Sequence, residues 1–109
     1  GMHQSGAFQA DGGARVAILD AGRATLELAN AAQVAFIDRV ETDGGRSDPL
    51  RVGLEVDDAA AMVDRLVDAG AGVEASARVT PWNSLNARLR GAGGLQITLF
   101  QELGTDGEA

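Results

Sequence analysis

The stretch from residue 50 to residue 100 constrains the fold most, because its hydrophobic period changes from that of a strand to that of a helix. Residues 50–56 (LRVGLEV) place Val52, Leu54 and Val56 on one face and charged residues or glycine on the other, the two-residue period of a strand with one apolar face. Residues 59–66 instead have apolar side chains three and four positions apart, which predicts an amphipathic helix.

The sequence also indicates where this helix begins and ends and which strands follow it. Asp57 or Asp58 is expected to cap the helix N-terminus, and Gly70 is expected to end it as a left-handed C-terminal cap. Short aliphatic segments then predict three more strands, over residues 71–79, 86–90 and 95–101. The four glycine-rich residues 91–94 lie between two of these strands and precede no helix, so they are interpreted as a hairpin connection rather than a phosphate-binding loop.

The first half of the chain contains fewer elements. Residues 1–14 are rich in Gly, Gln and Ser and predict at most one frayed edge strand, whereas residues 15–19 and 24–29 predict a hairpin around the turn at residues 20–22. Asn30 is positioned to cap a short helix over residues 31–38, and a strand over residues 33–40 is the competing interpretation. Residues 42–49 (TDGGRSDP) read as a linker.

The two halves repeat each other in part. The hairpins VAILDAGRATLELA and ARLRGAGGLQITLF align as strand, glycine turn and strand, with Glu27 opposite Thr98. The chain is therefore predicted to be an α+β protein of paired βαβββ modules, whose first module lacks its opening strand and helix. The expected organisation is an N-terminus with a possible edge strand over residues 1–14, an incomplete first module over 15–48, a complete second module over 49–103 and a polar tail over 104–109.

Composition excludes several classes of function. The chain has no cysteine, so disulfides and thiolate metal sites are excluded, and its only histidine is His3 near the terminus, so neither a Ser-His-Asp nor a Cys-His catalytic arrangement can be built. A formal net charge of -7 disfavours binding to nucleic acid or to anionic membranes. With neither a long apolar run nor a secretory signal pattern, the protein is expected to be soluble and cytoplasmic.

The phrases RVGLEVDDAAAMVDRLVDAGA and TPWNSLNARLRGAGGLQITLFQ resemble the second half of a vicinal oxygen chelate protein, the superfamily of glyoxalases, bleomycin resistance proteins and extradiol dioxygenases. The resemblance implies two βαβββ modules whose sheets curl around a cleft that holds a metal or a small ligand. The four usual metal ligands lie on the first, fourth, fifth and eighth strands. Glu27 matches the fourth-strand glutamate, while Arg51 stands at the fifth-strand histidine position, Thr98 stands at the eighth-strand glutamate position and the first strand has no counterpart.

A metal site is therefore not expected, since a guanidinium keeps its proton and cannot ligate. Arg51 is interpreted as a fixed cation that pairs with Glu27 across the cleft, and the alternative is that Arg51 is a solvated or purely structural strand residue. Acid-base chemistry would have to use Glu27 or Glu55, and no catalytic residue is assigned. Residues expected on the concave side also include Thr25, Gly53, Asn86 and Arg90, and the expected ligand-binding cleft comprises Glu27, Arg51, Glu55, Trp82, Arg88, Gln96, Thr98 and Phe100.

The leading functional hypothesis is a homodimeric protein of this superfamily that binds a small molecule in a polar cleft without metal or other cofactor. The homodimer is expected because a missing opening strand leaves an unpaired sheet edge. Two alternatives within the superfamily are a metal-dependent lyase, isomerase or dioxygenase, and a structural or regulatory subunit without a ligand. Outside it, a ferredoxin-like α+β domain is a further alternative.

Overall fold

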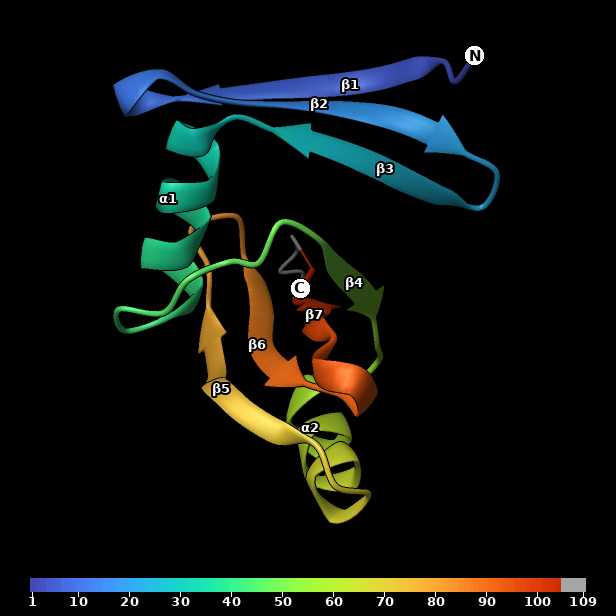
Figure 1. The fold of residues 1–109 in the computed structure, drawn as a ribbon, viewed down its shortest axis with the longest axis vertical. Coiled ribbons are helices and arrows are strands. Elements are labelled where there is room, and N and C mark those ends of the chain that lie inside the picture. The colour runs from blue at the N-terminus through green and yellow to red at the C-terminus, as the bar shows by residue number, and fades with distance from the viewer. Residues whose placement is uncertain (105–109) are drawn as a thin grey trace. The chain divides into compact units, whose positions relative to one another are not determined.

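The computed structural model describes residues 1–104 and divides the chain into two compact units. The first unit covers residues 1–37 and the second begins at Asp38, so the division falls inside one helix, α1 (Ala31–Glu41). Apart from Gly104, the predicted polar tail lies outside the described residues. The two units are described separately below (Figure 1).

The second unit contains a complete βαβββ module, as predicted. Its elements in chain order are β4 (Arg51–Glu55), α2 (Ala59–Asp68), β5 (Gly72–Val79), β6 (Ser84–Arg90), a short 3-10 turn η2 (Ala92–Gly94) and β7 (Gln96–Glu102). The strands form one sheet in the order β4-β7-β6-β5, in which β4 runs parallel to β7 and the other neighbours are antiparallel (Figure 1). The glycines at residues 91–94 connect two strands of a hairpin, as expected.

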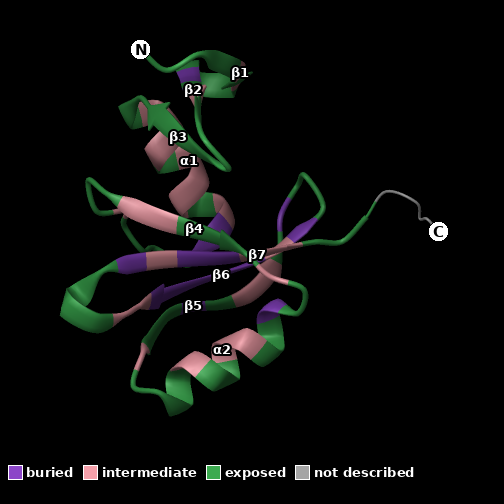
Figure 2. Cartoon of the chain, turned by 90° about the vertical axis from the view of Figure 1, so that its right-hand side faces the viewer, coloured by how far each residue is buried: buried purple, intermediate pink, exposed green. Residues whose placement is uncertain are grey.

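Helix α2 covers one face of this sheet. The Asp58 carboxylate caps the helix by accepting a hydrogen bond from the Ala61 amide at 3.0 Å, and Gly70 follows its end with a φ of 110°, so both predicted caps are confirmed. The helix packs on β5, β6 and β7 (Figure 2). Ala59, Ala87, Leu89 and Leu99 are buried and form the apolar core of the unit.

The opposite face of the sheet is polar and also buried. Because side chains alternate along a strand, Ser84, Asn86 and Arg88 of β6 point away from the apolar core, together with Gln96 and Thr98 of β7. All five are buried (Figure 2). The sequence predicted a polar face here, but an open one; the end of α1 and the following linker cover it instead.

The first unit is a three-stranded antiparallel sheet followed by the start of α1. Its elements are β1 (Gln4–Ala10), the 3-10 turn η1 (Asp11–Gly13), β2 (Ala14–Ala21) and β3 (Ala24–Ala29), in the spatial order β1-β2-β3. Asn30 joins the sheet to the helix: its side-chain oxygen accepts hydrogen bonds from the amides of Arg15 at 3.0 Å and Gln33 at 2.9 Å. The segment after Asn30 is therefore a helix rather than a strand.

The first unit lacks counterparts of β4 and α2, which agrees with the predicted missing strand and helix. Leu26 and Leu28 on β3 are 38% and 56% exposed, and a pocket of about 340 Å³ lined in part by Ala7, Ala17 and Leu28 lies on the same sheet. The α+β class and the incomplete first module are thus both observed.

Within residues 1–104, no helix is long and apolar enough to cross a membrane.

Candidate functional site

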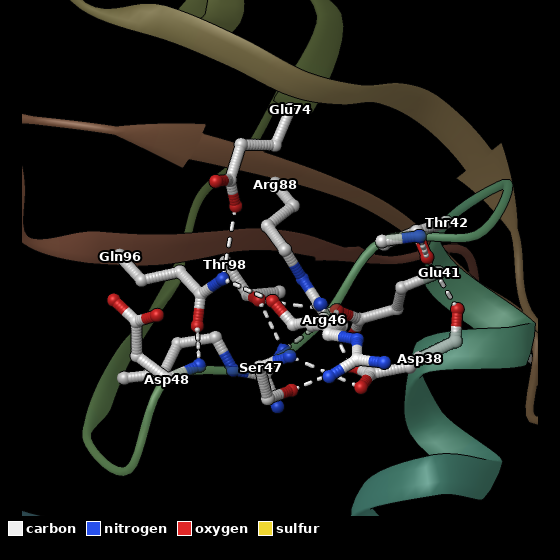
Figure 3. Close-up of polar contacts among 12 residues, drawn as sticks. Asp38, Glu41, Thr42, Arg46, Ser47, Asp48, Glu74, Arg88, Gln96 and Thr98 are labelled. Carbon is white, nitrogen blue, oxygen red and sulfur yellow. Dashed lines mark hydrogen bonds and ion pairs between the residues drawn. The ribbon is translucent and has the colours of Figure 1, made fainter.

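The carboxylate of Glu41, the last residue of α1, lies at the centre of a buried polar cluster. Its Oε1 atom accepts hydrogen bonds from Arg51 Nη1 at 2.8 Å, Arg88 Nη2 at 2.9 Å and Thr98 Oγ1 at 3.1 Å. Its Oε2 atom accepts one from Asn86 Nδ2 at 2.8 Å. Four donors therefore surround one carboxylate; Figure 3 labels Glu41 together with two of them, Arg88 and Thr98.

These donors come from three neighbouring strands of one sheet. Asn86 and Arg88 are two positions apart on β6 and share its polar face, while Arg51 comes from β4 and Thr98 from the strand between them, β7. Arg51 Nη1 also donates to Thr98 Oγ1 at 2.8 Å, and Asn86 Oδ1 accepts from Ser84 Oγ at 2.6 Å. The sheet fixes the backbone of the donors, and Arg51 is also held by Thr98, whereas both partners of the Arg88 guanidinium, Asp38 and Glu41, lie on α1.

Asp38, one helical turn before Glu41, binds the second half of the Arg88 guanidinium. Arg88 Nη1 donates to Asp38 Oδ1 at 2.8 Å, and the Ser47 amide donates to Asp38 Oδ2 at 3.0 Å (Figure 3). Burial by itself would raise the pKa of Asp38, but the hydrogen bonds from Ser47 and Arg88 and the charge of Arg88 outweigh it and hold the pKa below its ordinary value of 3.8. Asp38 is therefore ionised at neutral pH.

We call residues Asp38, Glu41, Arg51, Asn86, Arg88 and Thr98 the Glu41 cluster. It contains two cations and two anions, so its formal charges balance. The side chain of Arg88 is 0% exposed and that of Glu41 is 5% exposed, whereas that of Arg51 is 23% exposed. Solvent therefore reaches the cluster at Arg51, and also at Asp38, whose side chain is 15% exposed.

Not all hydrogen-bond donors of the Arg88 guanidinium have an acceptor. Its two Nη atoms each bind a different carboxylate, while its Nε atom is buried and has no hydrogen-bond partner among the described residues. A buried donor without a partner is unfavourable by about 1–3 kcal/mol. Glu41 and Asp38 thus leave one donor of this guanidinium unused.

The linker over residues 42–48 follows α1 and is held to the sheet by polar contacts. Gln96 is buried, donates from Nε2 to the Arg46 carbonyl at 2.9 Å and accepts at Oε1 from the Asp48 amide at 2.8 Å (Figure 3). Thr42 Oγ1 accepts from the Gly45 amide at 2.8 Å. At the end of the linker, the exposed Asp48 binds the Arg90 guanidinium, whose hydrogen bond lowers the pKa of Asp48.

The structure brings together four of the eight residues expected to line the cleft. Arg51, Arg88 and Thr98 belong to the Glu41 cluster, and Gln96 lies beside it and holds the linker. The carboxylate that pairs with Arg51 is Glu41, whereas Glu27, the expected partner, is an exposed residue of β3 in the first unit.

The other three expected residues lie outside the cluster. Glu55 at the end of β4 lines a separate pocket of about 390 Å³ with Asp58, the N-cap of α2, and Arg65 in the last turn of that helix. Trp82 is 45% exposed in the turn between β5 and β6. The ring of Phe100 lies against Gly53, since its Cε1 atom is 3.7 Å from the place that a Cβ on Gly53 would take.

Asp38 and Glu41, the two acids of the cluster, are not among the residues expected from the sequence. They are three positions apart and lie at the C-terminal end of α1, where the negative end of the helix dipole disfavours acids. Two acids on one face at this end are a signal for a cationic partner elsewhere in the fold. The signal becomes readable only when residues 31–41 are taken as a helix rather than a strand.

The residues at the expected ligand positions do not suit a metal ion. Arg51 cannot ligate, and Arg51 and Arg88 both direct positive charge at the point that Glu41 Oε1 occupies, which repels a cation. Among residues 1–104, no three His, Cys, Asp or Glu side chains are grouped so as to hold a metal ion.

No family model and no curated protein sequence matches this chain. Among solved structures, the chain is similar to the crystal structure of a glyoxalase family protein from Bacillus cereus. The two share 24% sequence identity and a TM-score of 0.51, over 95% of this chain and 80% of that one. At this identity the similarity establishes the fold. Together with the βαβββ module of the second unit, it shows that this chain has a glyoxalase-type fold.

Proposed function

We propose that this chain is a glyoxalase- and bleomycin-resistance-like protein that binds a small molecule on the polar face of its second module without a metal ion. The observation that supports the proposal most is the convergence of Arg51, Arg88, Asn86 and Thr98 on one point of that face. Ligand sites commonly combine a few convergent polar groups held by rigid elements. The partial exposure of Arg51 supports a route from solvent to this point.

Two fixed guanidinium groups favour an anionic or strongly polar ligand, because each can form paired hydrogen bonds to oxygen atoms. Arg51 also stands at the position that the resemblance assigns to a metal-ligating histidine. We therefore propose direct recognition by protein side chains rather than recognition through a metal. We assign no reaction, since Glu27 and Glu55, the two candidate acid-base residues, are not part of the cluster.

We further propose that the protein acts in the cytoplasm as a homodimer. The exposed strand β3, with Leu26 and Leu28 on its surface, supports the dimer, since open edges of sheets with apolar side chains favour pairing with another chain. The absence of cysteine is compatible with a reducing compartment.

One observation favours a second candidate function. Glu41 already satisfies the four donors with a group of the chain itself, and a fold closed in this way suits a structural or regulatory subunit that binds no ligand. The two candidates differ in whether the cluster accepts an external molecule.

Native mass spectrometry of protein purified without chelator distinguishes them. We expect a dimer without divalent ions that gains the mass of a bound molecule when it is incubated with a library of small organic acids. The Arg51→Ala variant should lose that mass, while the control Arg65→Ala, on the exposed surface of α2, should retain it. One divalent ion per subunit, or a ligand retained equally by Arg51→Ala, would contradict the proposal.

A further inference from the structure

We propose that the donors around Glu41 form a carboxylate-binding site that Glu41 occupies as an internal ligand, and that a carboxylate-bearing small molecule displaces Glu41 together with residues 42–48. The inference rests on the proposed function and adds to it the chemical class of the ligand and the way the site opens.

The donors match a carboxylate in number and position. Three of them, Arg51 Nη1, Arg88 Nη2 and Thr98 Oγ1, lie 2.8–3.1 Å from one oxygen, and Asn86 Nδ2 lies 2.8 Å from the other. All four belong to the sheet, whereas the carboxylate that they bind comes from α1. When Glu41 leaves, Arg51 keeps its hydrogen bond to Thr98 and Arg88 keeps the one to Asp38, and these bonds hold the two guanidinium groups near the same point.

Charge favours the exchange of one carboxylate for another. Without Glu41 the cluster would hold two arginines against Asp38 alone, an unbalanced positive charge in a buried place. Unpaired buried charge is strongly unfavourable, so the site needs one anionic group. The carboxylate of a ligand would restore the balance that Glu41 provides.

The donor that Glu41 leaves unused also supports binding of an external carboxylate. Arg88 Nε is buried without a partner, because Asp38 and Glu41 together occupy only the two Nη atoms. A small molecule that carries a further oxygen beside its carboxylate could accept from Nε, and would then bind Arg88 more completely than Glu41 does.

The linker that covers the site is suited to release. Residues 42–48 contain no aliphatic or aromatic side chain, and all of them except Thr42 and Ser47 are exposed. Contacts of the linker to the sheet are hydrogen bonds and ion pairs, such as Gln96 to the Arg46 carbonyl and Arg78 to Asp43. Water or a ligand can replace such contacts without exposing an apolar core, so opening is local.

The first test uses the Glu41→Ala variant with sodium acetate as the probe and sodium chloride at the same ionic strength as the reference. We expect the variant to melt at a lower temperature than the wild type, and acetate, but not chloride, to raise its melting temperature. Wild type should bind acetate at least about tenfold more weakly than the variant, because Glu41 competes for the same donors.

Asp43→Ala provides the matched control. Asp43 is an acid of the same linker that also pairs with an arginine, Arg78, but its side chain is 90% exposed. Acetate should stabilise this variant no more than it stabilises the wild type. If acetate failed to stabilise Glu41→Ala beyond chloride, the donors would not form a carboxylate site and the inference would be overturned.

A second measurement uses the wild type and does not depend on the folding of a variant. The amides of Gly45, Ser47 and Asp48 donate to Thr42, Asp38 and Gln96, so their hydrogen exchange reports on the closed linker. At saturating acetate we expect these amides to exchange faster while those of α2 do not change. A molecule that binds at Arg51 without faster exchange of these amides would overturn the displacement and leave the proposed function standing. The proposed function is tested separately, by the mass spectrometry of metal content and of library binding through Arg51.

Discussion

Replacing Arg88 with methionine should destabilise the second unit strongly. Among residues 1–104, Arg88 is the one cation that contacts both Asp38 and Glu41, at 2.8 and 2.9 Å, and its side chain is completely buried. Methionine has a similar length but an apolar side chain. It leaves Asp38 without an arginine partner and leaves Glu41 with Arg51 as its remaining cationic partner. The substitution therefore removes charge compensation while it changes packing little.

The size of the effect follows from the burial of the two acids. Their side chains are 15% and 5% exposed, and removal of one partner from a buried ion pair costs about 3–5 kcal/mol. That is a large share of the roughly 5–15 kcal/mol by which a domain is normally stable. With a denaturant dependence of about 2 kcal/mol per molar urea, the midpoint of unfolding should fall by roughly 1.5–2.5 M.

Urea unfolding at neutral pH, followed by tryptophan fluorescence, measures this loss in the second unit, since Trp82 is the only tryptophan and lies between β5 and β6. The matched control is Arg65→Met on the exposed surface of α2, which should unfold close to wild type. Adding Glu41→Gln to Arg88→Met should cost less than Glu41→Gln alone, with a coupling of about 0.5–3 kcal/mol. An Arg88→Met midpoint equal to that of Arg65→Met would refute the assignment of a buried ionic cluster.

Three further predictions concern single residues. Because the pKa of Asp38 is depressed in the fold, its stabilisation is complete above the unfolded value of 3.8 and is lost as the pH falls through the lower folded value. The free energy of unfolding should therefore drop more steeply below about pH 4 in wild type than in Asp38→Asn. Gly45→Ala should lower the melting temperature, since its Cβ would lie 2.9 Å from Oγ1 of the buried Thr42. The control Gly6→Ala, whose Cβ would lie 3.8 Å from its nearest neighbour, should have little effect. Equal changes in melting temperature for the two variants would contradict the packing of the linker. Leu28→Lys should convert the proposed dimer to monomer in light scattering, and an unchanged mass would argue against pairing at β3.

The fold of the second unit is predictable from the sequence because each of its elements has a local signal. The two-residue period of β4, the helical spacing after Asp58 and the glycines at residues 70 and 91–94 each act within a few neighbouring residues. The same alternation along β6 correctly places Asn86 and Arg88 on one polar face. Local chemistry was enough for these features.

The content of that polar face is not predictable in the same way. What covers it depends on the path of residues 42–48 and on where α1 ends. The sequence left open whether a helix over residues 31–38 or a strand over residues 33–40 follows Asn30. Glu41 reaches Thr98 across 57 positions in the chain, a separation at which no residue pattern is informative. The superfamily resemblance implied Glu27 as a ligand residue. The acid that binds Arg51 is instead Glu41, at the end of a helix and outside the usual ligand positions.

The central claim, that a small molecule binds at the Glu41 cluster, is tested most directly by the side-chain Nε–H signals of Arg51 and Arg88 in nitrogen-edited NMR spectra. The buried Nε–H of Arg88 has no partner among the described residues, so its signal should be sensitive to a new acceptor. We predict that a small organic acid found to bind shifts these two signals and leaves that of Arg65 unchanged. Binding that leaves both signals in place, or shifts Arg65 equally, would contradict a site at this cluster.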